Sequence, residues 1–296
     1  MQLMITGATG LTGEYLLSLL ASASVTDAIT CLIRPTSNLS ALKELNLSIK
    51  YIEGDSSSFE SWHSILASYT PETIIHIASI RHLSVLLPSL QQAQQTPRLI
   101  VVGTTGVYSQ YNQYSSVYQT LEQRLATYEG SYCLLRPTMI YGSHRDKNLH
   151  KLMRFCHRYG FFPMFGTGEC LLQPIHAEDL ATALFAVWQD PAIQGTYDLS
   201  GGSVVTFKQL LKLVEKLINK PVRVLQLPLD IGIWLASLSE TLLQTRSPIR
   251  QEQILRLQED KAYSHDRAAQ DFNFYPRSLE VGLSQEVTLL KQQGLL

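Results

Sequence analysis

The sequence has little of what marks several common classes of protein. Its 296 residues include only four cysteines, Cys31, Cys133, Cys156 and Cys170, which lie far apart. They form no CxxC pair and no cysteine–histidine cluster at zinc spacing, so neither a disulfide framework nor a zinc site is indicated. We expect four buried thiols and no bound metal.

An excess of one charge and a long apolar run are also lacking. The formal net charge is -1 at pH 7, whereas nucleic acids and anionic membranes usually require a concentrated basic patch. The apolar stretch from Val224 to Leu243 is interrupted by Gln226, Pro228, Asp230 and Glu240, so we expect no membrane span. The first residues show neither the basic region nor the cleavage site of a signal peptide. These features predict a cytoplasmic protein with a small-molecule ligand and no nucleic-acid partner.

The most informative feature present is a glycine-rich turn near the start. An uncharged apolar run, Leu3 to Ile5, predicts a buried strand, and Glu14 to Ser22 has the apolar spacing of a helix. Between them lies TGATGLTG, from Thr6 to Gly13. A turn between a strand and a helix presents free amides and the positive end of the helix dipole to an anion. We therefore expect a dinucleotide to bind here.

Each glycine of the turn has its own expected role. Gly7 allows backbone angles that a side chain would forbid, Gly10 lets the main chain approach a pyrophosphate, and Gly13 lets the helix pack closely on the strand. The remaining residues expected to bind the cofactor in this turn are Thr9, Leu11 and Thr12.

Strands and helices alternate after the turn. Further apolar strands are expected at Ala28–Ile33, Ile49–Glu53, Thr73–Ile77, Leu99–Val102, Tyr132–Leu135 and Gly195–Leu199. This alternation predicts an α/β fold with a doubly wound parallel sheet. We expect a dinucleotide-binding Rossmann domain of residues 1–142 and 173–200, and a smaller substrate lobe of residues 143–172 and 201–296. In the lobe, helices at Leu229–Leu243 and Arg250–Gln258 are expected to pack internally, with a homodimer or a membrane surface as alternative uses of their apolar faces.

The ends of the early strands bear on the choice of cofactor. Arg34 follows the second strand, where an acidic residue would accept bonds from the ribose and repel a 2′-phosphate. An arginine instead offers that phosphate a positive fork, which favours NADP over NAD, although Arg34 could simply be solvated. Asp55 either bonds the adenine amino group or caps the helix from Phe59 to Ala67. Ala78 and Ser79, after the fourth strand, are small enough to let a cofactor lie flat.

Several motifs together resemble the extended short-chain dehydrogenase/reductase family of nucleotide-sugar epimerases and dehydratases. They are the glycine turn, IIHIAS, VVGTTGVYS, LLRPTMIYG, QPIHAEDLA and FNFYPRSLEVGL, and they run through nearly the whole chain. The resemblance implies a nicotinamide cofactor, with Pro137 and Ile140 near its carboxamide. His76, inside the fourth strand, and Asp179 are expected to be structural.

In that family a serine or threonine holds the substrate oxygen, a tyrosine transfers a proton, and a lysine four residues later lowers the tyrosine pKa. The resemblance puts the hydroxyl role on Thr104 and, through the LEQRL motif, the proton-transfer role on Tyr114. Tyr118 then stands in the place of the lysine, where it could reach the ribose by hydrogen bond. Taking Tyr118 as the catalytic residue would put Glu122 there, which is electrostatically worse. Neither alignment supplies a lysine, and an aromatic stripe without chemistry is a further alternative.

Two hypotheses of function follow. The first is an NAD(P)-dependent oxidoreductase or epimerase/dehydratase-like enzyme acting on a carbonyl or hydroxyl of a small metabolite, nucleotide-sugars included. The predicted substrate region has few cations for a diphosphate, namely Arg145, Lys147, Lys151 and Arg154. The second is a non-catalytic NADP(H)-binding redox sensor or assembly protein, in which the missing lysine is expected.

Overall fold

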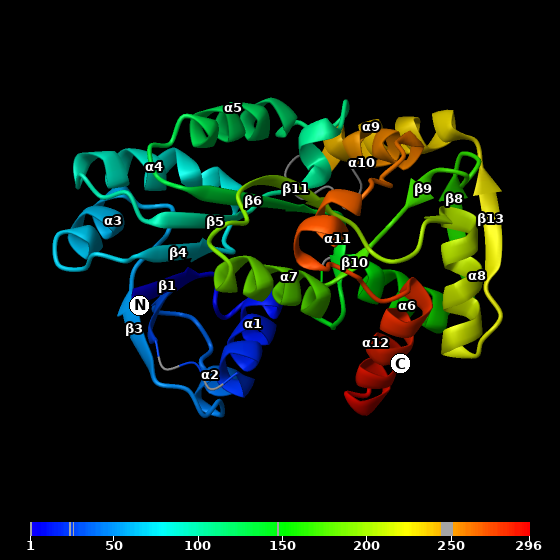
Figure 1. The fold of residues 1–296 in the computed structure, drawn as a ribbon. Helices are drawn as coiled ribbons and strands as arrows, with labels where there is room; N and C mark the ends of the chain where they lie inside the picture. The colour runs from blue at the N-terminus through cyan, green and yellow to red at the C-terminus, as the bar shows by residue number, and fades with distance from the viewer. Residues whose placement is uncertain (1, 24, 26, 147, 244–250) are drawn as a thin grey trace.

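The centre of the molecule is a seven-stranded parallel sheet, seen in a computed structural model that describes residues 2–23, 25, 27–146, 148–243 and 251–296 (Figure 1). The strands are β1 (Gln2–Thr6), β2 (Ala28–Ile33), β3 (Ile49–Glu53), β4 (Thr73–His76), β5 (Arg98–Val102), β6 (Tyr132–Pro137) and β11 (Gly195–Leu199). Their order is β11-β6-β5-β4-β1-β2-β3. The chain thus builds outward in both directions from β1, which confirms the predicted doubly wound sheet.

Helices cover both faces of the sheet (Figure 1). One face carries α1 (Leu11–Ser22), α7 (Ala177–Gln189) and α11 (Asp266–Phe272), and the other carries α3 (Phe59–Leu66), α4 (Leu83–Gln92) and α5 (Ser115–Ala126). A short helix, α2 (Ser40–Lys43), lies between β2 and β3. The strands are apolar on both faces because helices bury both of them. The resulting cores hold the carboxyl ends of the strands in fixed positions.

A third apolar core lies beside the sheet, at the right of Figure 1. It is built by α6 (Leu149–Tyr159), β8 (Phe161–Phe165), α8 (Phe207–Ile218), β13 (Arg223–Leu227) and α12 (Leu279–Gln292). Three short pairs of strands border it, formed by β7 (Ile140–Tyr141) with β10 (Ile175–His176), β9 (Leu171–Leu172) with β12 (Val205–Thr206), and β8 with β13. Parts of both segments expected to form the lobe share this core, whereas α11 packs on the sheet.

Helix α9 (Leu229–Leu243) departs from the expected internal packing. Its Ala236 is fully buried, but a stripe of large apolar side chains faces solvent. The stripe consists of Ile231, Trp234, Leu235 and Leu238, which are 42–63% exposed. Of the helix predicted over Arg250–Gln258, Arg250 lies outside the described residues, and the rest forms α10 (Gln251–Leu255) and a 3-10 turn. In the described part of the chain, no helix has the length and apolar character of a membrane span.

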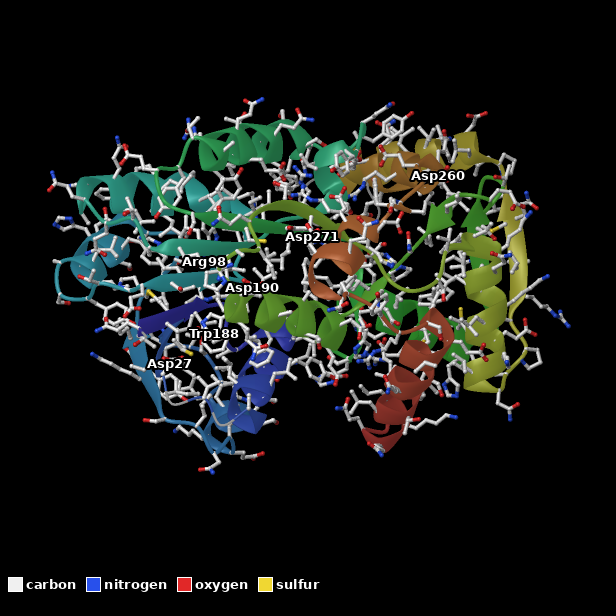
Figure 2. All side chains as sticks on the ribbon, in the orientation of Figure 1. Asp27, Arg98, Trp188, Asp190, Asp260 and Asp271 are labelled. Carbon is white, nitrogen blue, oxygen red and sulfur yellow. The ribbon has the colours of Figure 1, made fainter. Side chains whose placement is uncertain are left out.

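One arginine fastens the far edge of the sheet. Arg98, at the start of β5, donates to the backbone oxygens of Trp188, Asp190 and Ile193, at 3.3, 2.9 and 2.9 Å. Figure 2 labels Arg98 beside Trp188 and Asp190. These carbonyls belong to the end of α7 and to the connection to β11. A single guanidinium thus donates hydrogen bonds to backbone oxygens that have no partner within a helix or strand.

Candidate dinucleotide site

A groove of about 880 Å³ runs along the carboxyl ends of the strands. It crosses the ends of β1 and β4, where the order of the sheet reverses, which is the usual ligand position in this type of fold. Of the residues predicted to bind a cofactor, the groove is lined by Gly7, Thr9, Gly10, Leu11, Thr12, Arg34, Asp55, Ala78, Ser79, Tyr118, Pro137 and Ile140. Thr104, predicted to be catalytic, lines it too.

The glycine turn forms the middle of the groove. Gly7 has a φ of +74°, and a Cβ there would lie 2.9 Å from the amide nitrogen of Ala78. Gly10 is the N-cap of α1 and has no side chain to bond the first amides of the helix. Helix α1 accordingly starts at Leu11, three residues before the predicted start. The cradle and its open amides fit a pyrophosphate.

Gly13 does not line the groove. A Cβ at this position would lie 2.4 Å from the oxygen of Gly7 and 2.6 Å from that of Ala8. Gly13 therefore allows the close packing of α1 on the turn, the role that its position predicts, and does not touch the ligand space directly.

Arg34, Asp55 and His82 gather at the end of the groove where adenosine is expected. The amide of Ser57 donates to Asp55 Oδ1 at 2.9 Å, and this bond lowers the pKa of the Asp55 carboxyl. Ser58, and not Asp55, caps α3, so the capping alternative for Asp55 is wrong. His82 Nδ1 bonds Ser56 Oγ at 2.9 Å. Sequence reasoning missed His82, whose only signal was its place shortly after the fourth strand.

Thr104 and Tyr118 lie at the opposite end, with Pro137 and Ile140. The Thr104 hydroxyl oxygen accepts a bond from the Gly106 amide at 3.0 Å, which leaves its hydrogen available for another acceptor. Tyr118, from the first turn of α5, brings a phenol into the groove at the position that the resemblance gives to a lysine.

Tyr114 is not among the residues that line the groove. It is the N-cap of α5, is 38% exposed, and packs under the guanidinium of Arg81, 4.8 Å from the ring centre. Its ring centre is 6.3 Å from that of Tyr118. The proton-transfer role of Tyr114 stays a prediction, and it requires the phenol to reach a substrate that extends beyond the groove.

Glu122 has a partner of its own. Arg136 donates to both of its carboxylate oxygens, at 2.9 and 2.6 Å, and to the hydroxyl of Tyr108 at 2.7 Å. Tyr108 in turn donates to Asp198 at 2.9 Å. This network joins α5 to β6 and β11, which gives Glu122 a structural use outside the groove.

The remaining residues singled out in the sequence are buried in the framework. His76 bonds Thr6 through Nδ1 at 2.8 Å, and burial lowers its pKa to about 4. His176 caps α7, while Asp179 pairs with Arg277 at 2.9 Å. The cysteines are buried and unpaired. No group of metal-binding side chains occurs within the described ranges.

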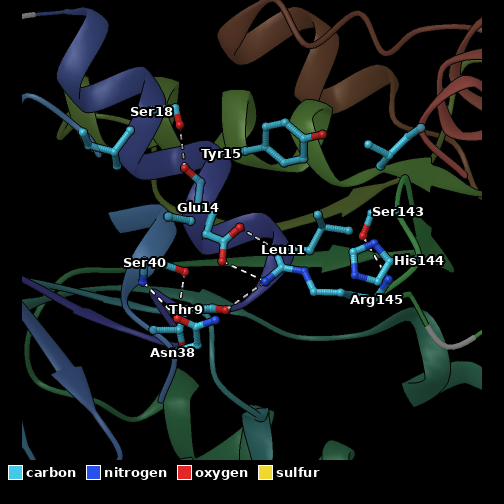
Figure 3. Close-up of a pocket in the computed structure, with 13 residues that line it drawn as sticks. Thr9, Leu11, Glu14, Tyr15, Ser18, Asn38, Ser40, Ser143, His144 and Arg145 are labelled. Carbon is cyan, nitrogen blue, oxygen red and sulfur yellow. Dashed lines mark hydrogen bonds and ion pairs between the residues drawn. The ribbon is translucent and has the colours of Figure 1, made fainter. Parts of the chain in front are cut away.

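A smaller cavity of about 540 Å³ adjoins the groove (Figure 3). Thr9, Leu11 and Arg145 line both spaces. Arg145 Nη1 donates to Glu14 Oε1 at 2.8 Å, and Nη2 donates to Oε2. The pair joins the loop before α6 to the first turn of α1. Of the other cations predicted near a substrate, Lys151 and Arg154 are exposed on α6, and Lys147 lies outside the described residues.

Comparison with known proteins agrees with this geometry. Residues 4–122 match the family model of GDP-mannose 4,6 dehydratase. The structure of dTDP-glucose 4,6-dehydratase from Bacillus anthracis, solved in complex with NAD, superposes with a TM-score of 0.74 at 16% identity and covers 100% of both chains. The chain has the Rossmann-like α/β fold of this dehydratase. The predicted resemblance to this epimerase/dehydratase-like, NAD(P)-binding fold is thereby confirmed.

Two curated relatives carry a different kind of name. Both are called NADH dehydrogenase [ubiquinone] 1 alpha subcomplex subunit 9, mitochondrial. The Arabidopsis thaliana protein is 28% identical over 141 residues, which is 47% of this chain and 35% of the relative. The Dictyostelium discoideum protein is 24% identical over 225 residues, which is 70% of this chain and 61% of the relative. The matches thus span between about a third and three fifths of these relatives.

Proposed function

We propose that the protein binds NADP(H) along the groove. The observation that carries the proposal is the continuity of one groove of about 880 Å³, from Arg34 and Asp55 across the glycine turn to Thr104 and Tyr118. Each section suits one part of a dinucleotide: a polar end for adenosine, uncapped helix amides for the pyrophosphate, and a hydroxyl-rich end for the nicotinamide ribose.

Arg34 supports the preference for NADP over NAD. It lines the groove one residue beyond β2, where its guanidinium is exposed to the ligand space. The backbone amide of Arg34 donates to Ser37 Oγ at 3.1 Å, which fixes the loop that carries both residues. A 2′-phosphate at this end would gain a charge-assisted bond that NADH cannot make.

Titration of the purified protein with NADPH and with NADH, followed by fluorescence, tests this assignment. NADPH is expected to bind more tightly, and Arg34→Ala should reduce the difference by about ten- to a hundredfold, the range of one charged hydrogen bond. Arg154→Ala, which removes a cation away from the groove, is the matched control. Equal affinities of the parent for both cofactors would refute the NADP preference, and binding of neither would refute the whole proposal.

As an enzyme, the protein would use the bound cofactor to accept or donate a hydride at a carbonyl or hydroxyl of a small metabolite. In this role Thr104 would bond the substrate oxygen, and the proton would come from Tyr118, or from Tyr114 if the substrate extends beyond the groove. A nucleotide-sugar diphosphate finds less support, because Lys151 and Arg154, two of the cations predicted for it, are exposed on α6 and do not line the groove.

A second candidate is a non-catalytic NADP(H)-binding subunit of a protein assembly. The favouring observation is that a tyrosine, Tyr118, occupies the position that the resemblance gives to a lysine, while Tyr114 does not line the groove. The exposed apolar stripe of α9 and the names of the curated relatives fit a protein partner. Helix α9 contains no lysine or arginine, so an anionic membrane surface fits this face less well.

Oxidation of NADPH in the presence of a panel of carbonyl compounds separates the two candidates. Turnover that falls in Thr104→Val and in one of the variants Tyr114→Phe and Tyr118→Phe would support the enzyme and identify its acid. Tight NADPH binding without turnover on any compound would support the subunit. The Tyr111→Phe variant controls for the loss of a phenol elsewhere in the same segment.

A further inference from the structure

A cation from outside the sheet reaches the glycine turn. Arg145 lies in the loop between β7 and α6, yet its side chain lines the groove together with Thr9, Leu11 and Thr12. Besides its two bonds to Glu14, its Nη1 lies 3.5 Å from the backbone oxygen of Thr9. Figure 3 shows the guanidinium spanning the space between Thr9 and Glu14. The guanidinium of Arg145 therefore lies against the glycine turn and the first turn of α1.

The loop that carries Arg145 is held from the other side. The Arg145 amide donates to Ser143 Oγ at 3.0 Å, and the Asp146 amide donates to the Ser143 oxygen at 3.0 Å. The Asp146 side chain is 1% exposed and accepts from the Asn148 amide at 2.7 Å. The backbone on both sides of Arg145 is thus fixed, and the guanidinium is aimed at α1 at reduced entropic cost.

The guanidinium retains donors for a further anion. It carries five N–H groups, and its bonds to Glu14 and Thr9 use only Nη1 and Nη2. Among the described residues, no hydrogen bond engages its Nε. The side chain is 38% exposed, on the ligand side of the turn. A phosphate oxygen can therefore be bound without breaking the contact with Glu14.

Glu14 makes such a cation necessary. Its carboxylate stands in the first turn of α1, where it competes with a phosphate for the same positive helix end. Without Arg145, this negative charge would repel a pyrophosphate at the turn. Pairing with Arg145 neutralises it, so that the net effect of the two side chains on the anion is favourable.

We propose that Arg145 binds the pyrophosphate of the dinucleotide, closing over the glycine turn from the C-terminal lobe, with Glu14 as its positioning residue. The assignment rests on the proposed function, since it concerns the same groove. The proposed role of Arg145 differs from that of Arg34. Both NADP(H) and NAD(H) contain the pyrophosphate that Arg145 would bind, whereas only NADP(H) contains the 2′-phosphate that Arg34 would bind.

That difference gives the test. In fluorescence titrations, Arg145→Gln should weaken NADPH and NADH by the same factor, about ten- to a hundredfold, with an unchanged ratio between them. Binding of 2′-AMP, which has no pyrophosphate, should not change. Glu14→Gln removes the negative charge but keeps an amide oxygen that can accept a bond from Arg145, so it should tighten both cofactors. The double variant should fall between the two single variants. Arg154→Gln is the control for charge, and thermal melting checks that each variant is folded.

The failures are distinguishable. If the parent binds both cofactors and Arg145→Gln binds them within about twofold of it, the assignment of Arg145 is wrong while the proposed function stands. If Arg145→Gln weakens the affinity for NADPH but not for NADH, Arg145 acts on the 2′-phosphate, and the pyrophosphate assignment is wrong. A parent that binds neither cofactor would overturn the proposed function and this inference together.

Discussion

Glu286 in α12 provides a sharp test of the electrostatics of the lobe. Its side chain is 1% exposed, so its carboxyl group is removed from water. The group that faces it is the carboxyl of Asp146, which also lies 3.3 Å from His150 Nδ1. Burial, assisted by Asp146, raises the pKa of Glu286 to about 10. We therefore infer that Glu286 keeps its proton in the folded protein and donates it to Asp146.

The sign of the effect follows from proton linkage. The unfolded chain releases this proton near the ordinary pKa of 4.5, whereas the folded chain holds it up to about 10. Between these values the folded state binds one proton more than the unfolded chain. The contribution of Glu286 to the free energy of unfolding is therefore largest below about pH 4.5 and falls as pH rises through this range. The slope is about 1.4 kcal/mol per pH unit, or at most about 3 kcal/mol between about pH 6 and about pH 8.

Urea unfolding across this pH range measures the slope. Glu286→Gln replaces the acid by an amide of the same shape, which can still donate to Asp146, and should flatten the profile and exceed the parent in stability at the alkaline end. Glu280→Gln, an exposed position of the same helix, should leave the slope unchanged. Identical slopes in the parent and in Glu286→Gln would show that Glu286 is ionised in the folded state.

Three other substitutions test the framework, each by urea unfolding. Gly13→Ala should cost about 1–3 kcal/mol, because its Cβ would lie 2.4 Å from the Gly7 oxygen; a cost near zero would show that α1 shifts freely. Arg98→Met should cost about 1–3 kcal/mol by leaving three backbone oxygens without their donor, and an unchanged midpoint would mean that water replaces the guanidinium. Arg277→Met should cost about 3–5 kcal/mol at neutral pH, because it leaves the buried Asp179 carboxylate unpaired; recovery in the double variant Arg277→Met with Asp179→Asn is expected, and its failure would point to lost packing instead.

Local patterns were enough to predict the sheet and most of the groove. A buried parallel strand is a short apolar run bounded by polar turns, and the turn after it must lie at the carboxyl edge of the sheet. Arg34, Asp55 and Ala78 each lie within two residues of the end of such a run, so their positions along the chain place them in the groove. Thr104 and Pro137 are predicted instead from the resemblance to the epimerase and dehydratase family.

Contacts between distant segments could not be predicted this way. Glu14 and Arg145 are separated by 131 positions, and only the fold brings them together. The pattern of the amphipathic helix predicts that Glu286 is exposed, yet it is buried, and Asp146 faces it from another segment. The placement of Tyr114 depends on the turn before α5, where its own amide donates to Asn112 Oδ1 at 3.0 Å, and no spacing rule fixes that geometry.

The two halves of the groove differ in how many of the groups needed for their proposed roles they contain. At the glycine turn, backbone amides, a bare N-cap and Arg145 all face the space proposed for the pyrophosphate, so the loss of any one would leave the others. At the opposite end, the hydroxyls of Thr104 and Tyr118 can hold a ribose or a substrate oxygen, but Tyr118 offers no positive charge to stabilise a phenolate. Arg81, the cation beside Tyr114, stacks on the face of its ring. Binding of the dinucleotide therefore has more support in this chain than any proton transfer that would follow it, and turnover, if found, must use a phenol that remains neutral until the substrate oxygen takes its proton.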